Sequence, residues 1–128
     1  MKLLLDTQAF LWFASGHPRL SKKARRRIED SRHDKYLSIA SVWEMAIKLG
    51  LGKLRLQVPL AEFIEVGATE NGIGLLGIEK EHAIRVATLP DHHRDPFDRL
   101  LAAQALAEGM TVVGRDDQFD GYGVRRVW

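Results

Sequence analysis

Four acidic residues stand where strands are expected to end or helices to begin: Asp6, Glu44, Asp98 and Asp116. Asp6 directly follows the apolar run 2–5, and Asp116 comes two residues after the run "TVVG". Carboxylates gathered at one place favour hard cations such as Mg²⁺ or Mn²⁺, which prefer oxygen ligands. A cation held in this way activates water for phosphodiester hydrolysis, and no nucleophilic side chain is needed.

Each of these acids also has a purely structural interpretation. Asp6 is suited to cap the helix that follows it, and "DPFD" at 95–98 combines a cap residue, a proline at the first helical position and an acid at the third. "SVWE" at 41–44 matches a capping box, and Glu44 stands one helical turn before Lys48. Capping explains why single acids are tolerated at these positions, but it does not explain why they should converge.

Electrostatic repulsion separates the two interpretations. Two carboxylates about 4 Å apart repel each other by about 1 kcal/mol in water and by about 4 kcal/mol near a protein surface. Helix N-termini offset part of this repulsion. Several converging carboxylates therefore require a cation. The residues leave two alternatives open, which are separate helix caps and a shared metal site with oxygen ligands.

The chain of 128 residues has the length and composition of one globular domain. Apolar residues make up 45% of it and charged residues 28%, with no repeat or linker. We therefore expect a single domain over 1–128. The absence of cysteine excludes disulfides and thiolate metal sites. No signal peptide or membrane-spanning apolar run is found, so we expect a cytoplasmic protein without a membrane partner.

Basic residues gather in several places although the net charge is only +2. The run "KKARRR" at 22–27 is one such place, and Arg94 and Arg99 flank the acids of the third region. Guanidinium groups suit phosphate, so nucleic acid is a permissible partner. The alternatives are a solvated helix face for 22–27 and an ordinary surface ion pair for Arg99.

Apolar runs bounded by caps and glycines predict strands that alternate with helices. Strands are expected at 2–5, 35–40, 73–78 and 110–114, with a short additional strand at 124–128. Helices are expected at 7–14, 22–31, 42–49, 60–69, 79–87 and 96–108. This alternation predicts an α/β fold with a mainly parallel central sheet flanked by helices. Ligands bind beyond the carboxyl ends of such strands, where Asp6, Glu44 and Asp116 are expected.

Four blocks of the sequence carry a resemblance: "LLLDTQAFLW", "SIASVWEMAIKLGLGKL", "HRDPFDRLLAAQA" and "VVGRDDQFDGYGV". In order and spacing they resemble the PIN-domain ribonucleases, in particular the VapC-like toxins of type II toxin–antitoxin modules. The blocks span essentially the whole chain. The resemblance implies a three-layer PIN-like domain and cleavage of RNA with Mg²⁺ or Mn²⁺. It also implies a homodimer that is inhibited by a small antitoxin.

Matched position by position, the acidic quartet of the family falls on Asp6, Glu44, Asp98 and Asp116. The resemblance further suggests Asp95, Asp117 and Thr7 as accessory residues, and Arg99, Arg94 and His93 as substrate contacts.

The sequence departs from the family pattern at two positions. Gln8 stands where the family often has His, and Gly114 stands where it usually has Ser or Thr. Because the missing hydroxyl is thought to help order the acidic site, Asp117 is an alternative to Asp116 as the fourth acid.

Two other functions remain to be weighed against a nuclease. A PIN-like module can bind RNA or a protein partner without cutting, with the acids serving only as caps. A haloacid-dehalogenase-like phosphatase or a receiver domain is disfavoured. The phosphatase requires a second Asp two residues after Asp6, where Gln8 stands, and the receiver requires an acidic pair there.

Overall fold

The computed structural model describes residues 1–91 and 95–128. Its strands are β1 (Lys2–Leu5), β2 (Asp34–Ser38), β3 (Ile73–Leu76), β4 (Thr111–Val113) and β5 (Arg126–Val127). They form one parallel sheet in the order β3-β2-β1-β4-β5. The predicted α/β architecture with a mainly parallel sheet is confirmed.

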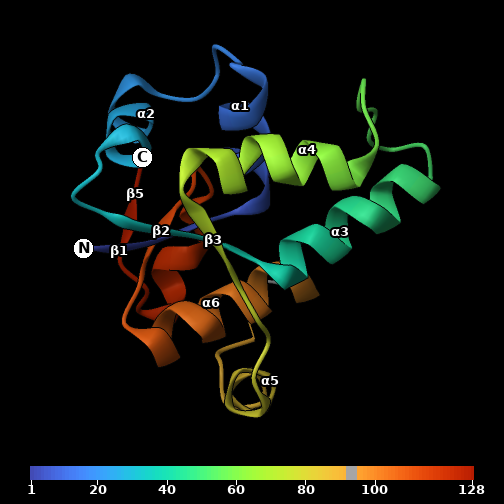
Figure 1. Ribbon diagram of the computed structural model, residues 1–128. Helices are drawn as coiled ribbons and strands as arrows, with labels where there is room; N and C mark the ends of the chain where they lie inside the picture. The colour runs from blue at the N-terminus through green and yellow to red at the C-terminus, as the bar shows by residue number, and fades with distance from the viewer. Residues whose placement is uncertain (92–94) are drawn as a thin grey trace.

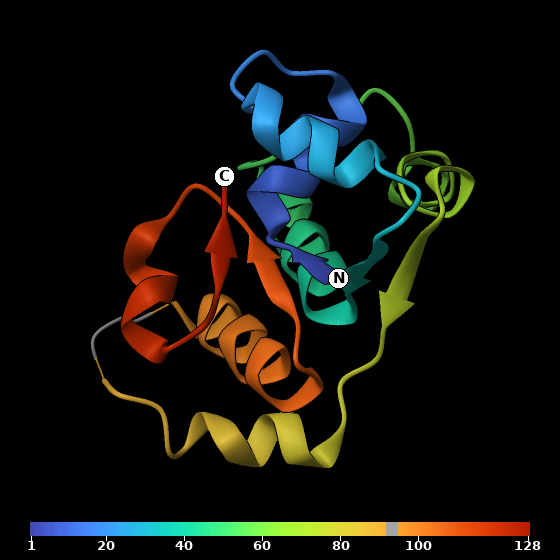
Figure 2. The ribbon, with the colours of Figure 1, turned by 90° about the vertical axis from the view of Figure 1, so that its left-hand side faces the viewer.

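Helices connect the strands and cover both faces of the sheet. The α-helices are α1 (Thr7–Ser15), α2 (Lys22–Glu29), α3 (Ile39–Gly50), α4 (Leu60–Gly67), α5 (Lys80–Val86) and α6 (Pro96–Glu108). Two 3₁₀ helices, η1 (Thr69–Asn71) and η2 (Asp117–Tyr122), complete the described elements. Figures 1 and 2 show α1 and α2 on one side of the sheet and α6 on the other.

The central strand β1 divides the core into two layers. Leu3 and Leu5 point to one face and pack with Phe10 of α1 and Ile28 of α2. Leu4 points to the opposite face and packs with residues of α6 and η2. Alternate residues of a strand face opposite sides, so a fully apolar strand is what a sheet covered on both faces requires. The expected three-layer arrangement follows.

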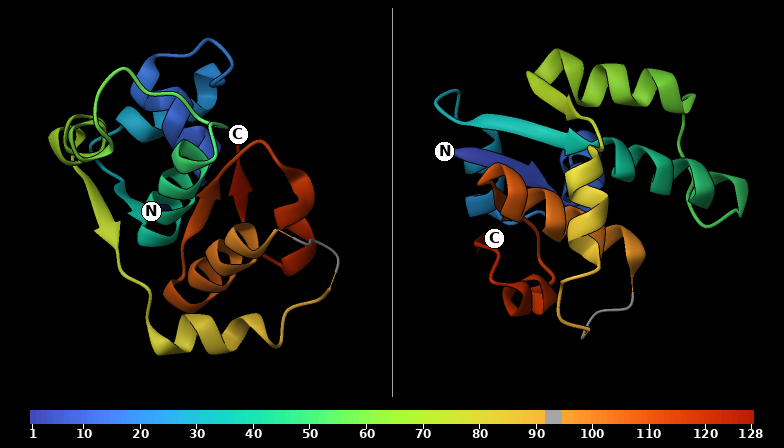
Figure 3. Two further views of the ribbon diagram at one scale, coloured as in Figure 1. Left: turned by 90° about the vertical axis from the view of Figure 1, so that its right-hand side faces the viewer. Right: turned by 90° about the horizontal axis from the view of Figure 1, so that it is seen from below.

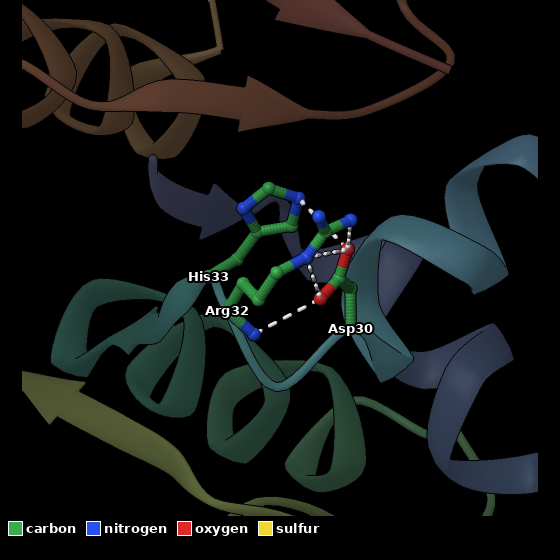
Figure 4. Close-up of polar contacts among 3 residues, drawn as sticks. All are labelled: Asp30, Arg32 and His33. Atoms are coloured by element: carbon green, nitrogen blue, oxygen red, sulfur yellow. Dashed lines mark hydrogen bonds and ion pairs between the residues drawn. The ribbon is translucent and has the colours of Figure 1, made fainter.

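The turn from α2 into β2 is fixed by Asp30 at the amino end of the sheet (Figure 4). The Asp30 carboxylate accepts hydrogen bonds from the backbone N–H of Arg32 at 2.9 Å and from its Nη2 atom at 2.8 Å. These contacts with Arg32 hold the pKa of Asp30 below its usual range. The predicted helix 22–31 therefore ends two residues early, because Asp30 closes the turn instead of extending the helix.

The boundary between β2 and α3 differs from the expectation. The strand was expected to run to residue 40 and the helix to begin after Ser41, but β2 ends at Ser38 and α3 begins at Ile39. The side chain of Ser38 accepts the hydrogen bond from the N–H of Ala40 and caps the helix. The capping-box interpretation of "SVWE" is therefore wrong, because Ser41 lies inside the helix.

The remaining boundaries agree within a few residues. The third strand ends at Leu76 instead of residue 78, and the expected helix 60–69 is divided into α4 and the 3₁₀ helix η1. Within the described ranges, no helix is long and apolar enough to cross a membrane.

Candidate active site

The predicted acids line one cleft at the carboxyl end of the sheet. Asp6 follows β1, Glu44 lies on α3, Asp98 lies in the first turn of α6, and Asp116 follows β4. The cleft has a volume of about 190 Å³, and Thr7, Gln8, Leu11, Lys48 and Asp95 also line it. Helix α3 contacts both α1 and α6, and Figure 3 shows α3 and α6 side by side. The fold thus brings together acids that are far apart in the sequence.

Asp6 both caps α1 and faces the other acids. Its Oδ1 atom accepts a hydrogen bond of 2.7 Å from the N–H of Ala9, as the capping interpretation predicted. The side chain is almost fully buried. Burial raises the pKa of Asp6, and the negative charges of Asp98, Asp116 and Glu44 add to this effect. The hydrogen bond from Ala9 opposes it, and together these influences bring the pKa to about 7. The carboxylates are therefore close enough to influence one another's charge.

Glu44 is held by a chain of hydrogen bonds. Its Oε1 atom lies 2.7 Å from the Thr7 hydroxyl, which in turn lies 2.8 Å from the Ser41 hydroxyl. An ionised carboxylate only accepts hydrogen bonds, so Thr7 donates to Glu44 and Ser41 donates to Thr7. Thr7, expected as an accessory residue, thus orients the carboxylate of Glu44. Ser41 gains a role in the site that its sequence position did not suggest.

Lys48 is a cation built into the acidic cleft. Its Nζ atom lies 2.6 Å from Oε2 of Glu44, one helical turn away on α3. The hydrogen bond to Glu44 raises the pKa of Lys48, and the charges of Asp95 and Asp98 add to the effect. Sequence reasoning recognised the pair only as a helix-stabilising contact. The i, i+4 spacing was the signal that Lys48 would face the site whenever Glu44 does.

The start of α6 carries two acids of the cleft. Asp95 caps the helix, and its Oδ1 atom accepts from the N–H groups of Phe97 at 2.9 Å and of Asp98 at 3.3 Å. Pro96 occupies the first turn, as expected. The Phe97 ring packs edge to face on Trp43 of α3, with 5.4 Å between the ring centroids. This contact and the cap set the direction in which Asp98 enters the cleft.

Gly114 leaves room for the carboxylate of Asp6. A Cβ atom at Gly114 would lie only 2.5 Å from Oδ2 of Asp6. A serine or threonine does not fit there unless the carboxylate moves. The departure from the family pattern therefore brings Asp6 close to the end of β4.

Asp116 is better placed than Asp117 as the fourth acid. Asp116 lines the acidic cleft, and its charge acts on Asp6. It also caps η2 by accepting from the N–H of Gln118 at 3.0 Å. Asp117 lies outside the acidic cleft and lines an adjacent one. Of the two candidates for the fourth acid, the structure therefore favours Asp116 over Asp117.

The guanidinium of Arg99 contacts the protein's own backbone carbonyls and an aromatic ring. Its guanidinium donates to the carbonyl of Pro90 at 2.8 Å and to the carbonyl of Val86 at 3.0 Å. The guanidinium also lies over the Tyr122 ring at 6.0 Å from its centroid. These contacts fasten the end of α5 to α6, which favours an anchoring role over a substrate contact. Two other expected substrate contacts, His93 and Arg94, lie outside the described residues.

The donor set suits a hard divalent cation, since every acidic side chain of the cleft offers oxygen. Within residues 1–91 and 95–128, no three histidine, aspartate or glutamate side chains form a ready-made ligand set. Mg²⁺ keeps several of its waters and typically takes one or two carboxylates directly. The burial of Asp6 and the raised pKa caused partly by its acidic neighbours identify a group that a bound cation would stabilise in the charged form. The residues therefore fit such an ion.

A second cleft adjoins the acidic one and was not anticipated from the sequence. Its volume is about 430 Å³, and it is lined by Asp6, Gln8, Trp12, Arg115, Asp116 and Asp117. Gln8 and Trp12 are one helical turn apart on α1, which was the only sequence signal that they share a face.

Comparisons with known proteins agree with the fold. A curated relative, Ribonuclease VapC22 of Mycobacterium tuberculosis, is 28% identical over 117 residues, which cover 89% of this chain and 86% of the relative. The structure of VapBC2 from Rickettsia felis bound to a promoter DNA fragment matches with a TM-score of 0.74 at 15% identity, over 99% of this chain and 98% of the other.

The structure of FitAcB from Neisseria gonorrhoeae matches with a TM-score of 0.63 at 20% identity, over 98% of this chain and 96% of the other. At these identities the structural matches establish the fold. Residues 3–124 match the PIN domain family, and the chain therefore belongs to the PIN domain family.

Proposed function

We propose that the protein is a metal-dependent endoribonuclease and the toxin of a toxin–antitoxin pair. The observation that carries the proposal is the single cleft lined by Asp6, Glu44, Asp98 and Asp116, which offers only oxygen ligands. The similarity to a protein named Ribonuclease VapC22 supports RNA as the substrate.

The acids of the cleft are proposed to hold Mg²⁺ or Mn²⁺, with Asp6, Glu44, Asp98 and Asp116 as direct or water-mediated ligands. When bound, such an ion lowers the pKa of a coordinated water and neutralises charge that develops on the phosphate. Asp95 orients the first turn of α6, on which Asp98 lies. Thr7 and Ser41 keep the Glu44 carboxylate in one orientation, and Lys48 balances its charge. A fixed carboxylate loses less entropy when it engages a ligand, so this support favours catalysis.

The protein is further proposed to form a homodimer and to bind a small antitoxin. The fold relatives VapBC2 and FitAcB, the first solved on promoter DNA, support a protein partner. Exposed apolar side chains also follow one face of α3, at Ile39, Trp43 and Ile47, and Leu51 directly follows the helix. A partner that covers this face would remove the apolar surface from water.

The nuclease proposal is tested by incubating total RNA with wild type, Asp6→Asn and Glu44→Gln. Wild type is expected to cut RNA with Mg²⁺ or Mn²⁺ and to lose activity in EDTA. Each variant is expected to be at least about a hundredfold slower, because it removes a charge from the cation site. Asp34→Asn, at the amino end of β2, is the control and should cut like wild type. Equal cleavage with and without EDTA would contradict the proposal.

The second candidate is a PIN-like module that binds RNA or a partner without cutting it. The caps formed by Asp6 and Asp95 and the ion pair between Glu44 and Lys48 favour it, because they give these acids structural roles. Such a module would bind RNA through its arginines with strong salt dependence and without need of the acids. A cleavage assay at high protein concentration distinguishes the two functions.

A further inference from the structure

The second cleft lies directly beside the acidic one. The two clefts share the residues Asp6, Gln8 and Asp116. The acidic cleft, at about 190 Å³, offers carboxylates and one ammonium, whereas the second cleft, at about 430 Å³, adds an aromatic ring and a guanidinium. A volume of several hundred Å³ is the size range of small-ligand pockets. A chain molecule with one group in the first cleft would therefore place its next group in the second.

The Trp12 ring in this cleft is packed against two neighbouring rings. It is half-buried, and His17 stacks on it with 5.6 Å between the ring centroids and 24° between the planes. The Trp128 ring lies 5.9 Å away at an angle of 53°. Gly16, at a φ of 66°, turns the chain so that His17 folds back on the helix, and the N–H of His17 donates to the Trp12 carbonyl at 2.8 Å. A ring fixed by its neighbours is a preorganised surface for stacking.

Polar groups surround this ring. Gln8 and Arg115 are exposed, and they present an amide and a guanidinium to the cleft. Asp117 adds a carboxylate. An amide and a carboxylate can pair with the donors and acceptors on the edge of a nucleobase, and a guanidinium suits phosphate. Proteins that bind single-stranded RNA combine aromatic stacking with nearby arginine in this way.

We propose that the second cleft is a nucleobase subsite, in which an unpaired base stacks against Trp12 while the neighbouring phosphate lies at the acidic cleft. This subsite rests on the proposed nuclease function and specifies its substrate as RNA that is single-stranded beside the cut bond. A base inside a duplex stacks on its own neighbours and would first have to leave them. Gln8 and Asp117 then contact the base edge, and Arg115 contacts a flanking phosphate.

The test compares two probes of equal length and charge, which are a short oligoadenylate and an abasic ribose-phosphate oligomer. Binding is measured with Mg²⁺ on an Asp6→Asn background, in which cleavage of the probe is expected to be at least about a hundredfold slower. Trp12→Leu is expected to weaken oligoadenylate binding by about tenfold and to leave binding of the abasic oligomer unchanged, because stacking requires a base. Trp12→Phe, which keeps an aromatic face, should recover part of the loss.

Ile84→Ala is the control, since Ile84 is an exposed apolar side chain on α5 that is not among the residues lining either cleft. It should bind both probes as the parent does. If Trp12→Leu is poorly folded by circular dichroism, Gln8→Ala replaces it, because Gln8 is exposed and its truncation should also reduce oligoadenylate binding alone. Equal losses for both probes, or no loss, would overturn the subsite.

A cleavage assay with wild type distinguishes failure of the subsite proposal from failure of the nuclease proposal. If wild type cuts RNA in a metal-dependent way but shows no preference for the base-bearing probe, only the subsite is refuted. If wild type neither cuts nor binds RNA, the nuclease proposal fails and the subsite fails with it.

Discussion

At the scale of single residues, helix capping and the proposed cation site use the same side chains. One carboxylate oxygen of Asp6 accepts a hydrogen bond from the N–H of Ala9, and the other lies beside Gly114. Asp95 likewise caps α6 from within the cleft, and Asp116 caps η2. A helix N-terminus stabilises a carboxylate by its dipole and its free N–H groups, so it lowers the cost of bringing several acids together. The structural and functional interpretations of these acids are therefore compatible.

The raised pKa of Asp6 gives a pH dependence of stability when no divalent cation is present. The folded-state pKa of about 7 exceeds the ordinary aspartate pKa of 3.8 that applies in the unfolded chain. The contribution of Asp6 is thus fully present below about pH 4 and is lost as the pH rises through 7. Between pH 5 and pH 8, we expect the unfolding free energy of wild type to fall by about 3 kcal/mol relative to Asp6→Asn, in urea titrations with EDTA.

Asparagine caps a helix as well as aspartate does, so Asp6→Asn is expected to keep the contact with Ala9. The substitution therefore removes the titrating group without removing the helix cap. A difference between wild type and variant that is constant with pH would show that Asp6 does not titrate in this range.

At the scale of the elements, the site depends on how α6 is fastened. The helix begins at a proline behind the Asp95 cap and packs through Phe97 on Trp43 of α3. Arg99, one turn further on, binds the carbonyls of Val86 and Pro90 at the end of α5. These contacts determine where the first turn of α6 lies relative to β1 and β4, and with it the place of Asp98.

Replacing the Arg99 side chain by an apolar one tests this anchoring role. Arg99→Met is expected to lower the free energy of unfolding by about 1–3 kcal/mol, because two carbonyls lose a charged hydrogen-bond donor. Thermal or urea unfolding measures the effect, and Arg85→Met, at an exposed arginine of α5, is the matched control. A variant with unchanged stability but much weaker RNA binding would instead assign Arg99 to the substrate.

At the scale of the whole molecule, the site exists only in the folded chain. Its acids follow β1, lie on α3, begin α6 and follow β4, so each comes from a separate strand–helix unit. The parallel sheet brings the carboxyl ends of these units to one edge, where ligands of such sheets bind. Any ion held by acids from several units binds the native state and stabilises it against unfolding.

Addition of Mg²⁺ should therefore raise the melting temperature of wild type. Saturation at about 100 times the dissociation constant adds about 2.7 kcal/mol of stability. The increase should be largely lost in Asp6→Asn and retained in Asp34→Asn, which changes an acid at the other end of the sheet. Differential scanning calorimetry over a range of MgCl₂ concentrations measures the shift, and an equal shift in both variants would indicate nonspecific binding.

Local features of the chain were readable from the sequence because they depend on near neighbours. Asp6 and Asp95 were recognisable as caps, and the apolar run 2–5 as a buried strand, since each is defined within a few residues. The start of α3 was misplaced because "SIAS" suits both a strand end and a helix start. Packing against the sheet decides between them, and Ser38 caps the helix instead of Ser41.

The sequence by itself determined the α/β alternation, the helix caps and the acids that were candidates for one site, because spacing and residue type are sufficient for these. Only the tertiary structure decided that the acids share one cleft, that Gly114 gives Asp6 its room, and that Lys48 and Trp12 border the same region. The physical reason is that contacts between distant segments depend on sheet order and helix packing. No residue type specifies these alone.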